Sequence, residues 1–391
     1  MVEIESCVLF STADWNAPYW TNKQHTAALL AKRGTKVLYI ESIGLRMPNL
    51  SNLKDFSRLS KRLVTGLRTL LMGPRYVQTN VWVLSPLVIP FKHDQAAVRW
   101  FNQILLNYQV TFFLMKRKLK NPLIWTYHPF MLELMKRSPR PKLVYHCVDD
   151  LAAVPGVNAI TFKNAELKLL SQADVVFATA PALAEYCIKH NSNTHFFGNV
   201  VDEKHFGKAL DIELKIPPDL KSIPRPRICY HGILSDYKID FELLADIVRM
   251  KPEWSFVIIG EEREGQKSAK VQEIANLTNV HFLGYRDYKV LPDYLRGIQV
   301  GLLPSLINNY TNGMFPMKCY EYLAAGVPVV STNLSFSKNG ISGILTADNS
   351  MAFIKAIDKQ LLRGRFNRDE TIQLVADNTW DARLSKMLKI I

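Results

Sequence analysis

The chain has 391 residues, of which 48% are hydrophobic and 21% charged, which excludes a disordered protein and favours two globular domains over one. Lys and Arg exceed Asp and Glu by 14, so we expect an anionic partner such as a nucleotide or an acidic membrane surface. The five cysteines are scattered and form no CxxC pair, which argues against a disulfide framework or a zinc site. We find no signal peptide and no apolar run of about 18 residues, and therefore expect a cytoplasmic protein without a spanning helix.

Short β-rich runs alternate with helical stretches along the whole chain. Their mostly apolar composition is typical of strands that are covered on both faces. The predicted strands are 5–10, 36–41, 81–85, 123–127, 142–147, 174–179, 194–199, 227–232, 254–260, 279–284, 298–304, 327–332 and 343–347. This alternation predicts an α/β protein with doubly wound parallel sheets.

The segment 211–226 interrupts the alternation. It carries four prolines and no helical or strand periodicity, which indicates a linker. We therefore predict one Rossmann-like domain over 1–210 and a second over 227–370. In such folds the ligand site lies at the carboxyl ends of the strands.

The most informative stretch is 308–332, with the sequence NNYTNGMFPMKCYEYLAAGVPVVST. Proline suits a first helical turn, so we expect a helix to begin near Pro316. Lys318 and Glu321 then lie on one face of that helix. A helix N-terminus favours a bound diphosphate, and Glu321 can accept hydrogen bonds from ribose hydroxyls. An isolated KxxE pair, in contrast, would more simply be a solvent-exposed helical pair.

This stretch resembles the donor-site signature of GT-B glycosyltransferases of the group 1, family 4-like type. The resemblance is to bacterial members that build exopolysaccharide, teichuronic acid or lipopolysaccharide sugars. The matching positions are Asn308, Thr311, Pro316, Lys318, Glu321, Tyr322, Gly326 and Pro328. The resemblance implies two Rossmann-like domains that face each other across a cleft, with the acceptor bound by 1–210 and the nucleotide sugar by 227–370. It also implies a helix within 371–391 that crosses back to the first domain.

The resemblance assigns roles to individual donor-site residues. Lys318 is expected to contact the donor phosphates and Glu321 the ribose. The residues expected to line the diphosphate and sugar are Asn308, Thr311, Asn312 and Met317. The wider retaining family often has a second Glu eight residues before the ribose Glu, and this chain has Gly313 there. The resemblance therefore predicts no stereochemical outcome.

Two earlier positions support a donor site. Gly232 follows a predicted strand and would allow a phosphate to approach the backbone, although it could equally be a plain turn. By the resemblance, Tyr285 and Arg286 hold the nucleobase; the alternative for both is a surface turn.

Acceptor contacts are expected in the polar and aromatic loop after the first strand. Aromatic faces suit sugar rings, and the resemblance places this loop at the cleft. The candidate contacts are Asp14, Trp15, Asn16 and Trp20. Each of these side chains could instead pack the loop.

Inverting transfer needs a general base for the acceptor hydroxyl. The strand 142–147 leads into Asp149 and Asp150, and resemblance to exopolysaccharide glucuronosyltransferases favours Asp150 as the base, with Asp149 next. Helix N-capping is the alternative role. His128 also ends a strand, and could bind the donor sugar, take a proton or be structural. The two acids are adjacent rather than alternating, which disfavours a DxD metal site. The resemblance likewise implies no metal and no cofactor besides the nucleotide sugar.

Two regions of the first domain combine basic and apolar residues at helical spacing, a profile typical of membrane-surface helices. In 46–75 these are Arg46, Lys54, Arg58, Lys61, Arg62, Arg68, Arg75 and Leu59, Leu63, Leu67, Leu70, Leu71. In 98–118 they are Trp100, Phe101, Leu105, Phe112, Phe113 and Leu114 before Lys116, Arg117 and Lys118. We expect both regions to bind the anionic inner leaflet, and the acceptor to be a polyprenyl-linked sugar or an oligosaccharide. For 98–118 the alternative is an ordinary helix that covers the sheet.

The pattern as a whole predicts a metal-independent glycosyltransferase that uses a UDP- or GDP-sugar in cell-surface polysaccharide synthesis. A GT-B nucleotide-sugar epimerase and a non-catalytic sugar-nucleotide-binding protein are the alternatives. No GxGxxG follows an early strand, which disfavours a nucleotide-dependent oxidoreductase. No nucleic-acid-binding module is recognisable, so no nucleic-acid partner is expected.

Overall fold

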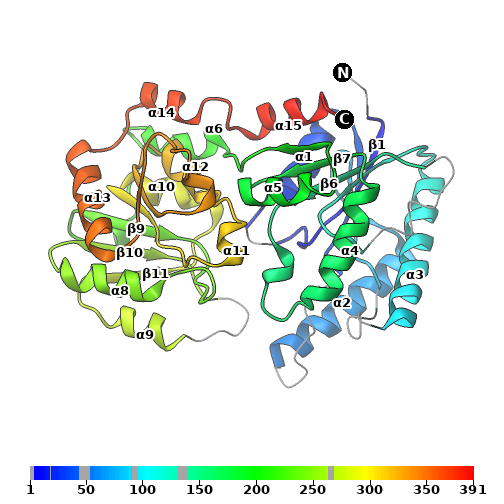
Figure 1. Cartoon of the computed structure of the whole chain (residues 1–391), viewed down its shortest axis with the longest axis horizontal. Helices are drawn as coiled ribbons and strands as arrows, with labels where there is room; N and C mark the ends of the chain where they lie inside the picture. The colour runs from blue at the N-terminus through cyan, green and yellow to red at the C-terminus, as the bar shows by residue number, and fades with distance from the viewer. Residues whose placement is uncertain are drawn as a thin grey trace. The chain divides into compact units, whose positions relative to one another are not determined.

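The computed structural model describes residues 4–17, 19–43, 53–87, 89, 95–130, 140–262 and 268–391, with the backbone alone for 53–61, 96 and 99. The chain forms two compact units. One consists of Met1–Phe197 with Leu384–Ile391, and the other of Gly198–Arg383 (Figure 1). Each unit contains one predominantly parallel sheet, so the predicted α/β class with two doubly wound sheets is confirmed.

The first unit contains an eight-stranded sheet in the order β3-β4-β2-β1-β5-β6-β7-β8. Its strands are β1 Ser6–Phe10, β2 Lys36–Ile40, β3 Arg75–Gln78, β4 Val81–Leu84, β5 Leu123–Thr126, β6 Leu143–Cys147, β7 Val175–Ala178 and β8 Thr194–Phe196. All neighbouring strands are parallel except the edge pair β3 and β4, which is antiparallel. The sequence did not predict β3, because this exposed edge strand lacks the apolar run of a buried one.

Helices cover the sheet of the first unit. They are α1 Asn22–Lys32, α2 Leu53–Met72, α3 Ala96–Lys116, α4 Ala159–Gln172 and α5 Pro181–Ile188. The chain's last helix, α15 Trp380–Leu388, contributes Leu384 and Met387 to the core cluster that also holds Leu9, Tyr39 and Trp125. Within the described residues, no helix is both long enough and apolar enough to cross a membrane.

The second unit contains a six-stranded, fully parallel sheet in the order β11-β10-β9-β12-β13-β14. Its strands are β9 Arg227–His231, β10 Ser255–Ile259, β11 Val280–Gly284, β12 Val300–Leu303, β13 Val329–Thr332 and β14 Ile344–Ala347. Counted from β9, this is the 3-2-1-4-5-6 order of dinucleotide-binding folds, in which the strand order reverses between β9 and β12. Ligands of such sheets bind beyond the carboxyl ends of the strands at that reversal.

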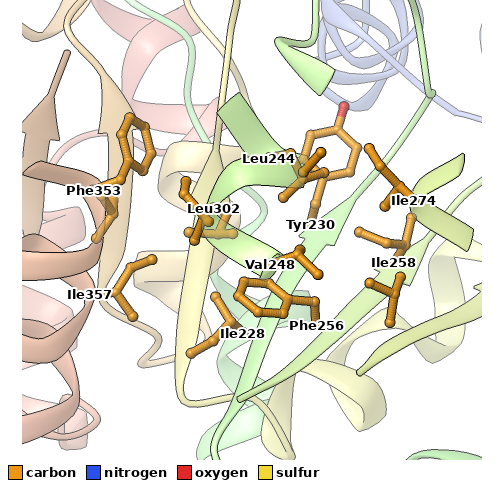
Figure 2. Packing of buried hydrophobic residues seen from close by; sticks show 14 of the residues in the cluster. Ile228, Tyr230, Leu244, Val248, Phe256, Ile258, Ile274, Leu302, Phe353 and Ile357 are labelled. Atoms are coloured by element: carbon orange, nitrogen blue, oxygen red, sulfur yellow. The ribbon is translucent and has the colours of Figure 1, made fainter. Parts of the chain in front are cut away.

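Helices lie on both faces of the second sheet. They are α6 Glu203–Phe206, α7 Pro218–Lys221, α8 Phe241–Met250, α9 Ala269–Ala275, α10 Leu291–Arg296, α11 Asn309–Asn312, α12 Lys318–Ala324, α13 Ser350–Arg363 and α14 Arg368–Val375. Figure 1 shows α8 and α9 on one side of the sheet and α10 and α12 on the other. Figure 2 shows the core between the sheet and α8, where Ile228, Phe256 and Leu302 of the sheet meet Leu244 and Val248 of α8.

The boundary between the units differs from the predicted one. The chain divides between Phe197 and Gly198, and the predicted linker 211–226 lies inside the second unit. Its prolines prevent a long helix, but Leu220 and Ile223 are buried. The guanidinium of Arg227 also binds this segment, donating a hydrogen bond of 2.8 Å from Nε to the carbonyl of Ile223. A proline-rich segment was therefore taken for a linker, although two apolar side chains anchor it.

Candidate functional site

The candidate donor site lies where β9 ends, beside the reversal of strand order in the second sheet. Gly232 follows β9 with φ +122°, and Gly260 follows β10 with φ +154°, both in the region that favours glycine. A Cβ at Gly260 would lie 1.9 Å from the carbonyl oxygen of Gly232. The two strands therefore end in a tight backbone contact, and the peptide of Gly232 is left without a side chain above it.

Lys318, the first residue of α12, fills the space above Gly232. A Cβ at position 232 would lie 2.2 Å from Lys318 Cε and 2.6 Å from its Nζ. The same ammonium lies 5.3 Å from the ring centre of Tyr230. In the described part of the chain no carboxylate lies within 4.0 Å of this ammonium, and burial lowers the pKa of Lys318 while Glu321 opposes the shift. Lys318 thus presents a cation to the glycine backbone without a neutralising ion pair.

A second cation, Lys238, lies in the loop between β9 and α8, and the sequence analysis did not name it. Its Nζ lies 4.9 Å from the ring centre of Tyr310 and 5.4 Å from that of Tyr237. Burial raises the pKa of Tyr230, and the charge of Lys238 opposes that rise, so this ammonium too acts on Tyr230. A lysine six residues after Gly232 was the available signal. The site therefore holds two lysines near one buried tyrosine.

Glu321 and His231 form the inner part of the site. Glu321 is 9% exposed, and its Oε2 lies 3.5 Å from Nε2 of His231. Burial raises the pKa of Glu321 to about 7, with Lys318 opposing the rise. Burial, aided by Lys318, lowers the pKa of His231 to about 3, so the imidazole is neutral near pH 7. Tyr322 fixes the pair, because its hydroxyl accepts a 3.1 Å hydrogen bond from the amide of His231.

The helix that carries Lys318 and Glu321 is shorter than predicted. It was expected to begin near Pro316, but α12 spans only Lys318–Ala324, with Met317 as its N-cap residue. A helix of seven residues adds little dipole at its start, and Met317 provides no capping side chain. The attraction for an anion therefore comes from the lysine side chains rather than from the helix terminus.

Two predicted donor contacts instead build the loop between β12 and α12. The Asn308 side chain accepts a 2.9 Å hydrogen bond from the amide of Thr311 and donates one of 2.9 Å to the carbonyl of Tyr237. The Thr311 hydroxyl donates to the carbonyl of Leu306 at 2.6 Å, and this residue is fully buried. A direct contact of Thr311 with a ligand does not fit this placement. Asn312 and Met317 are half-buried and stay candidates.

Arg286 is engaged within the second unit. Its Nη2 lies 2.7 Å from Asp219 Oδ2, and its Nε donates a 2.6 Å hydrogen bond to the hydroxyl of Tyr294. The hydrogen bonds from Arg286 and Tyr294 hold the pKa of Asp219 below its ordinary value against the effect of burial. The Arg286 side chain therefore ties the end of β11 to the segment 211–226. Tyr285 beside it is half-buried and stays a candidate for the nucleobase.

The loop after β1 holds the four predicted acceptor contacts, and the structure separates them. Trp15 is 6% exposed and packs against Tyr39 with ring centres 5.1 Å apart, so it belongs to the core rather than to a contact surface. Trp20 is half-buried against Trp15, with ring centres 5.0 Å apart. Asp14 and Asn16 are exposed. The prediction for Trp15 is wrong because the packing alternative holds for it.

Two acids follow β6, and each faces a lysine. Asp150 Oδ1 lies 3.2 Å from Lys163 Nζ, and Asp149 Oδ2 lies 3.9 Å from Lys23 Nζ. Asp150 precedes the short 3₁₀ helix Leu151–Ala153, but its side chain makes no capping hydrogen bond there. Its side chain is 22% exposed. Asp150 is thus a partly accessible carboxylate beside a cation and not a helix cap.

His128 is buried at the end of β5. Burial lowers the pKa of His128 to about 4, so the ring is neutral near pH 7. Its Nδ1 accepts a 3.2 Å hydrogen bond from the amide of Phe130, which assigns the ring proton to Nε2. Within the described residues, Nε2 has no hydrogen-bond partner. A neutral ring with an unengaged N–H is better suited to donate to a sugar hydroxyl than to take up a proton.

Two α/β units with parallel sheets, and polar groups at the strand reversal of the second, are features of the GT-B fold. Sucrose-phosphate synthase from Thermosynechococcus elongatus has this fold; it aligns over 99% of this chain and 98% of its own, with a TM-score of 0.70 and 15% identity. HepE from Anabaena in complex with UDP aligns over 99% and 100%, with a TM-score of 0.63 and 14% identity. Likeness at these identities concerns the fold alone.

The sequence comparisons find glycosyltransferases. Residues 225–363 match the family Glycosyl transferases group 1. The putative teichuronic acid biosynthesis glycosyltransferase TuaH of Bacillus subtilis (strain 168) is 28% identical over 275 residues, 63% of this chain and 66% of the relative. The match thus spans just under two thirds of the relative's length. The chain is thus similar in fold to GT-B proteins and, over part of its length, similar in sequence to bacterial glycosyltransferases.

Proposed function

We propose that the chain transfers a sugar from a nucleoside diphosphate donor to a saccharide hydroxyl in the synthesis of a cell-surface polysaccharide. The observation that carries this proposal is the Lys318 ammonium against the backbone of Gly232, with a second cation, Lys238, acting on the neighbouring Tyr230. The UDP bound to the HepE fold relative and the name of the Bacillus subtilis relative support a UDP-sugar and a surface polysaccharide.

The diphosphate binds the Lys318 ammonium beside Gly232, whose missing side chain makes room for the lysine. Lys318 and Lys238 supply the countercharge, so the reaction requires no metal ion. Glu321 accepts hydrogen bonds from the ribose hydroxyls, for which its carboxylate form is the better acceptor. Tyr285 borders the nucleobase, and the Nε2–H of His128 donates to a hydroxyl of the transferred sugar.

Asp150 is the general base for the acceptor. It takes the proton of the acceptor hydroxyl while the hydroxyl oxygen forms a bond to the anomeric carbon of the donor. The bond from that carbon to the diphosphate oxygen breaks, and its electron pair leaves with the nucleoside diphosphate. This displacement inverts the anomeric centre. Its leaving group gains charge as the bond breaks, and the two lysines are placed to stabilise that charge.

The acceptor is a lipid-linked saccharide reached from an anionic membrane surface. On α3, large exposed side chains recur every three or four residues, on one face of the helix: Trp100 65%, Ile104 48%, Tyr108 62%, Phe112 48% and Met115 66%. The opposite face of α3 is buried through Leu106, Val110, Phe113 and Leu114. The buried face of α3 fits the covering-helix alternative, and the first stripe is exposed on the other face.

The helix α2 has a similar face, with Val64 67%, Leu67 49%, Leu71 82% and Met72 75% exposed. Exposed cations near the two helix ends provide the electrostatic attraction to anionic lipid: Arg68, Lys116, Arg117, Lys118 and Lys120. Arg46 and the side chains of Lys54, Arg58, Leu59 and Lys61 lie outside the described residues.

The function is tested first by a screen for donor binding and then by an assay of sugar transfer. Thermal unfolding is measured with UDP-, GDP- and dTDP-sugars, since a bound ligand raises the transition temperature. UDP or GDP release is then followed with a polyprenyl-linked acceptor, in the presence and absence of EDTA. We expect stabilisation by one class of donor, transfer that persists in EDTA, and loss of transfer but not of nucleotide binding in Asp150→Asn. Isomerised donor without transfer would establish an epimerase instead.

A further inference from the structure

We infer that Lys163 is a positioning residue for the general base: its ammonium is shared between Asp150 and the buried Glu166, and this sharing holds the Asp150 carboxylate in its orientation. The inference rests on the proposed role of Asp150. All the groups involved lie in the first unit: Asp150 follows β6, Lys163 and Glu166 lie on α4, Tyr145 on β6 and Tyr186 on α5.

Three side chains meet at the Lys163 ammonium. Its Nζ lies 3.2 Å from Asp150 Oδ1 and 3.1 Å from Glu166 Oε2, and 4.2 Å from the ring centre of Tyr186. Burial works against the charge, but the two carboxylates together raise the pKa of Lys163 above its ordinary value. The lysine is therefore a permanent cation at the pH of the cell.

Glu166 explains why the cation stays in place. Its side chain is 2% exposed, and its Oε1 accepts a 2.7 Å hydrogen bond from the hydroxyl of Tyr145. A buried carboxylate needs such partners, because an unpaired buried charge is strongly unfavourable. Glu166 thus binds Lys163 on the buried side of the ammonium, while Asp150 binds it on the partly exposed side.

The geometry gives the two oxygens of Asp150 different tasks. Oδ1 is buried and faces Lys163, which leaves Oδ2 for the acceptor hydroxyl. Among the described residues, the other charged or titratable groups around the pair are Tyr145 and Cys147 on β6, Tyr186 and Cys187 on α5, and the ion pair of Asp149 with Lys23 on α1. Charges of both signs therefore act on Asp150, and Lys163 contributes the nearest cation.

Lys163 and Glu166 must consequently act in opposite directions. In Lys163→Met the cation nearest the Asp150 carboxylate is lost, so we expect the acidic limb of the pH–rate profile to move to higher pH by about one unit. In Glu166→Gln the lysine serves Asp150 alone, so that limb moves to lower pH. Lys163→Arg keeps the charge and restores a limb close to that of the wild type.

The experiment measures kcat/KM against pH from 4 to 9, with the nucleotide sugar that the wild type turns over among UDP-glucose, UDP-N-acetylgalactosamine, UDP-glucuronic acid and GDP-mannose. Lys168→Met is the matched control, because Lys168 is an exposed lysine on the same helix. The double variant Lys163→Met with Glu166→Gln removes both buried charges and guards against misfolding of the single variant. Its acidic limb should lie between those of the wild type and Lys163→Met.

Opposite shifts in the two single variants support the inference, since a purely structural role would not give shifts of opposite sign. An unchanged limb in Lys163→Met, or shifts in the same direction, would overturn it. Asp150→Asn separates the two proposals. Retained activity there refutes Asp150 as the base, whereas lost activity together with an unmoved Lys163→Met profile refutes only the role of Lys163.

Discussion

The side chain of Lys318 occupies the volume that a Cβ at Gly232 would need: such a Cβ would lie only 2.2 Å from Cε of the lysine. The glycine has φ +122°, so a side chain there would also strain the backbone. The pairing brings an ammonium against the backbone without an intervening side chain. In the proposed function, the cation for the donor diphosphate is therefore supplied by α12, and the glycine after β9 makes room for it.

Replacing Gly232 with Ala should displace the Lys318 ammonium and weaken UDP binding about tenfold, which corresponds to about 1.4 kcal/mol. Isothermal titration with UDP measures the change. Gly207→Ala is the control, because a Cβ there would have its nearest contact at 4.0 Å and Gly207 has an ordinary φ of −61°. Equal UDP affinity in Gly232→Ala and the wild type would mean that the fit between these two residues has no part in binding.

Glu321→Gln should stabilise the protein at pH 8 and leave its stability unchanged at pH 4. Burial raises the pKa of Glu321 from 4.5 to about 7 in the folded protein. As pH rises from 4.5 to 7, the unfolded chain therefore loses this proton first, and stability of the folded state falls by a few kcal/mol at most. Glutamine does not titrate and escapes that loss.

Thermal unfolding of both proteins at pH 4, 6 and 8 tests the Glu321 prediction. The neutral His231, whose pKa is lowered to about 3, loses its own contribution as pH falls below 6.5. That effect is common to both proteins and cancels in the difference. A difference in transition temperature that is the same at all three pH values would contradict the titration of Glu321.

Arg286→Met should lower stability and leave UDP affinity within about twofold of the wild type. The guanidinium binds Asp219 and Tyr294, so its loss frees the segment 211–226 at one point. We expect the transition temperature to fall by about 2–4 °C, the shift that a loss of about 1 kcal/mol causes in a domain of this size. Asp219→Asn should have a similar effect. A large loss of UDP affinity with unchanged stability would instead support a direct contact of Arg286 with the donor.

Exchanging Trp100, Phe112 and Met115 together for Ser should abolish flotation with vesicles of anionic lipid. The wild type should float with phosphatidylglycerol and not with phosphatidylcholine alone, and its binding should weaken as salt screens the lysines and arginines. Leu362→Ser is the control, since Leu362 is 90% exposed on α13 of the other unit. A wild type that floats equally with both lipids, or with neither, would contradict the proposed membrane surface.

The sequence predicted the buried parallel strands well, because a strand covered on both faces has a continuous apolar run. The same reasoning overlooked β3, because this strand lies at the exposed edge of the sheet and its residues show no clear hydrophobic period. It also took 211–226 for a linker, because prolines exclude long helices but do not prevent Leu220 and Ile223 from being buried. Local composition indicates which secondary structure a segment can form. Whether its side chains are buried depends on the tertiary contacts of the segment.

The candidate site was predicted in part for a similar reason. The spacing of Lys318 and Glu321 is a local feature of the sequence, so the motif alone could assign both residues to the donor site. Which aromatic residue of a loop packs inward is a property of the whole fold, so Trp15 could not be told from an exposed tryptophan. The contacts of Lys163 with Asp150 join residues that are thirteen positions apart, and no periodicity reports such a pair.

The central claim is that the nucleoside diphosphate binds against Gly232 through the side chain of Lys318. The most direct measurement is the affinity of the full chain for UDP by isothermal titration, in the wild type, in Lys318→Met and in the exposed-lysine control Lys355→Met. The account predicts a loss of at least about tenfold in Lys318→Met and wild-type affinity in Lys355→Met. Undiminished UDP binding by Lys318→Met, in a protein that unfolds at the wild-type temperature, would contradict it.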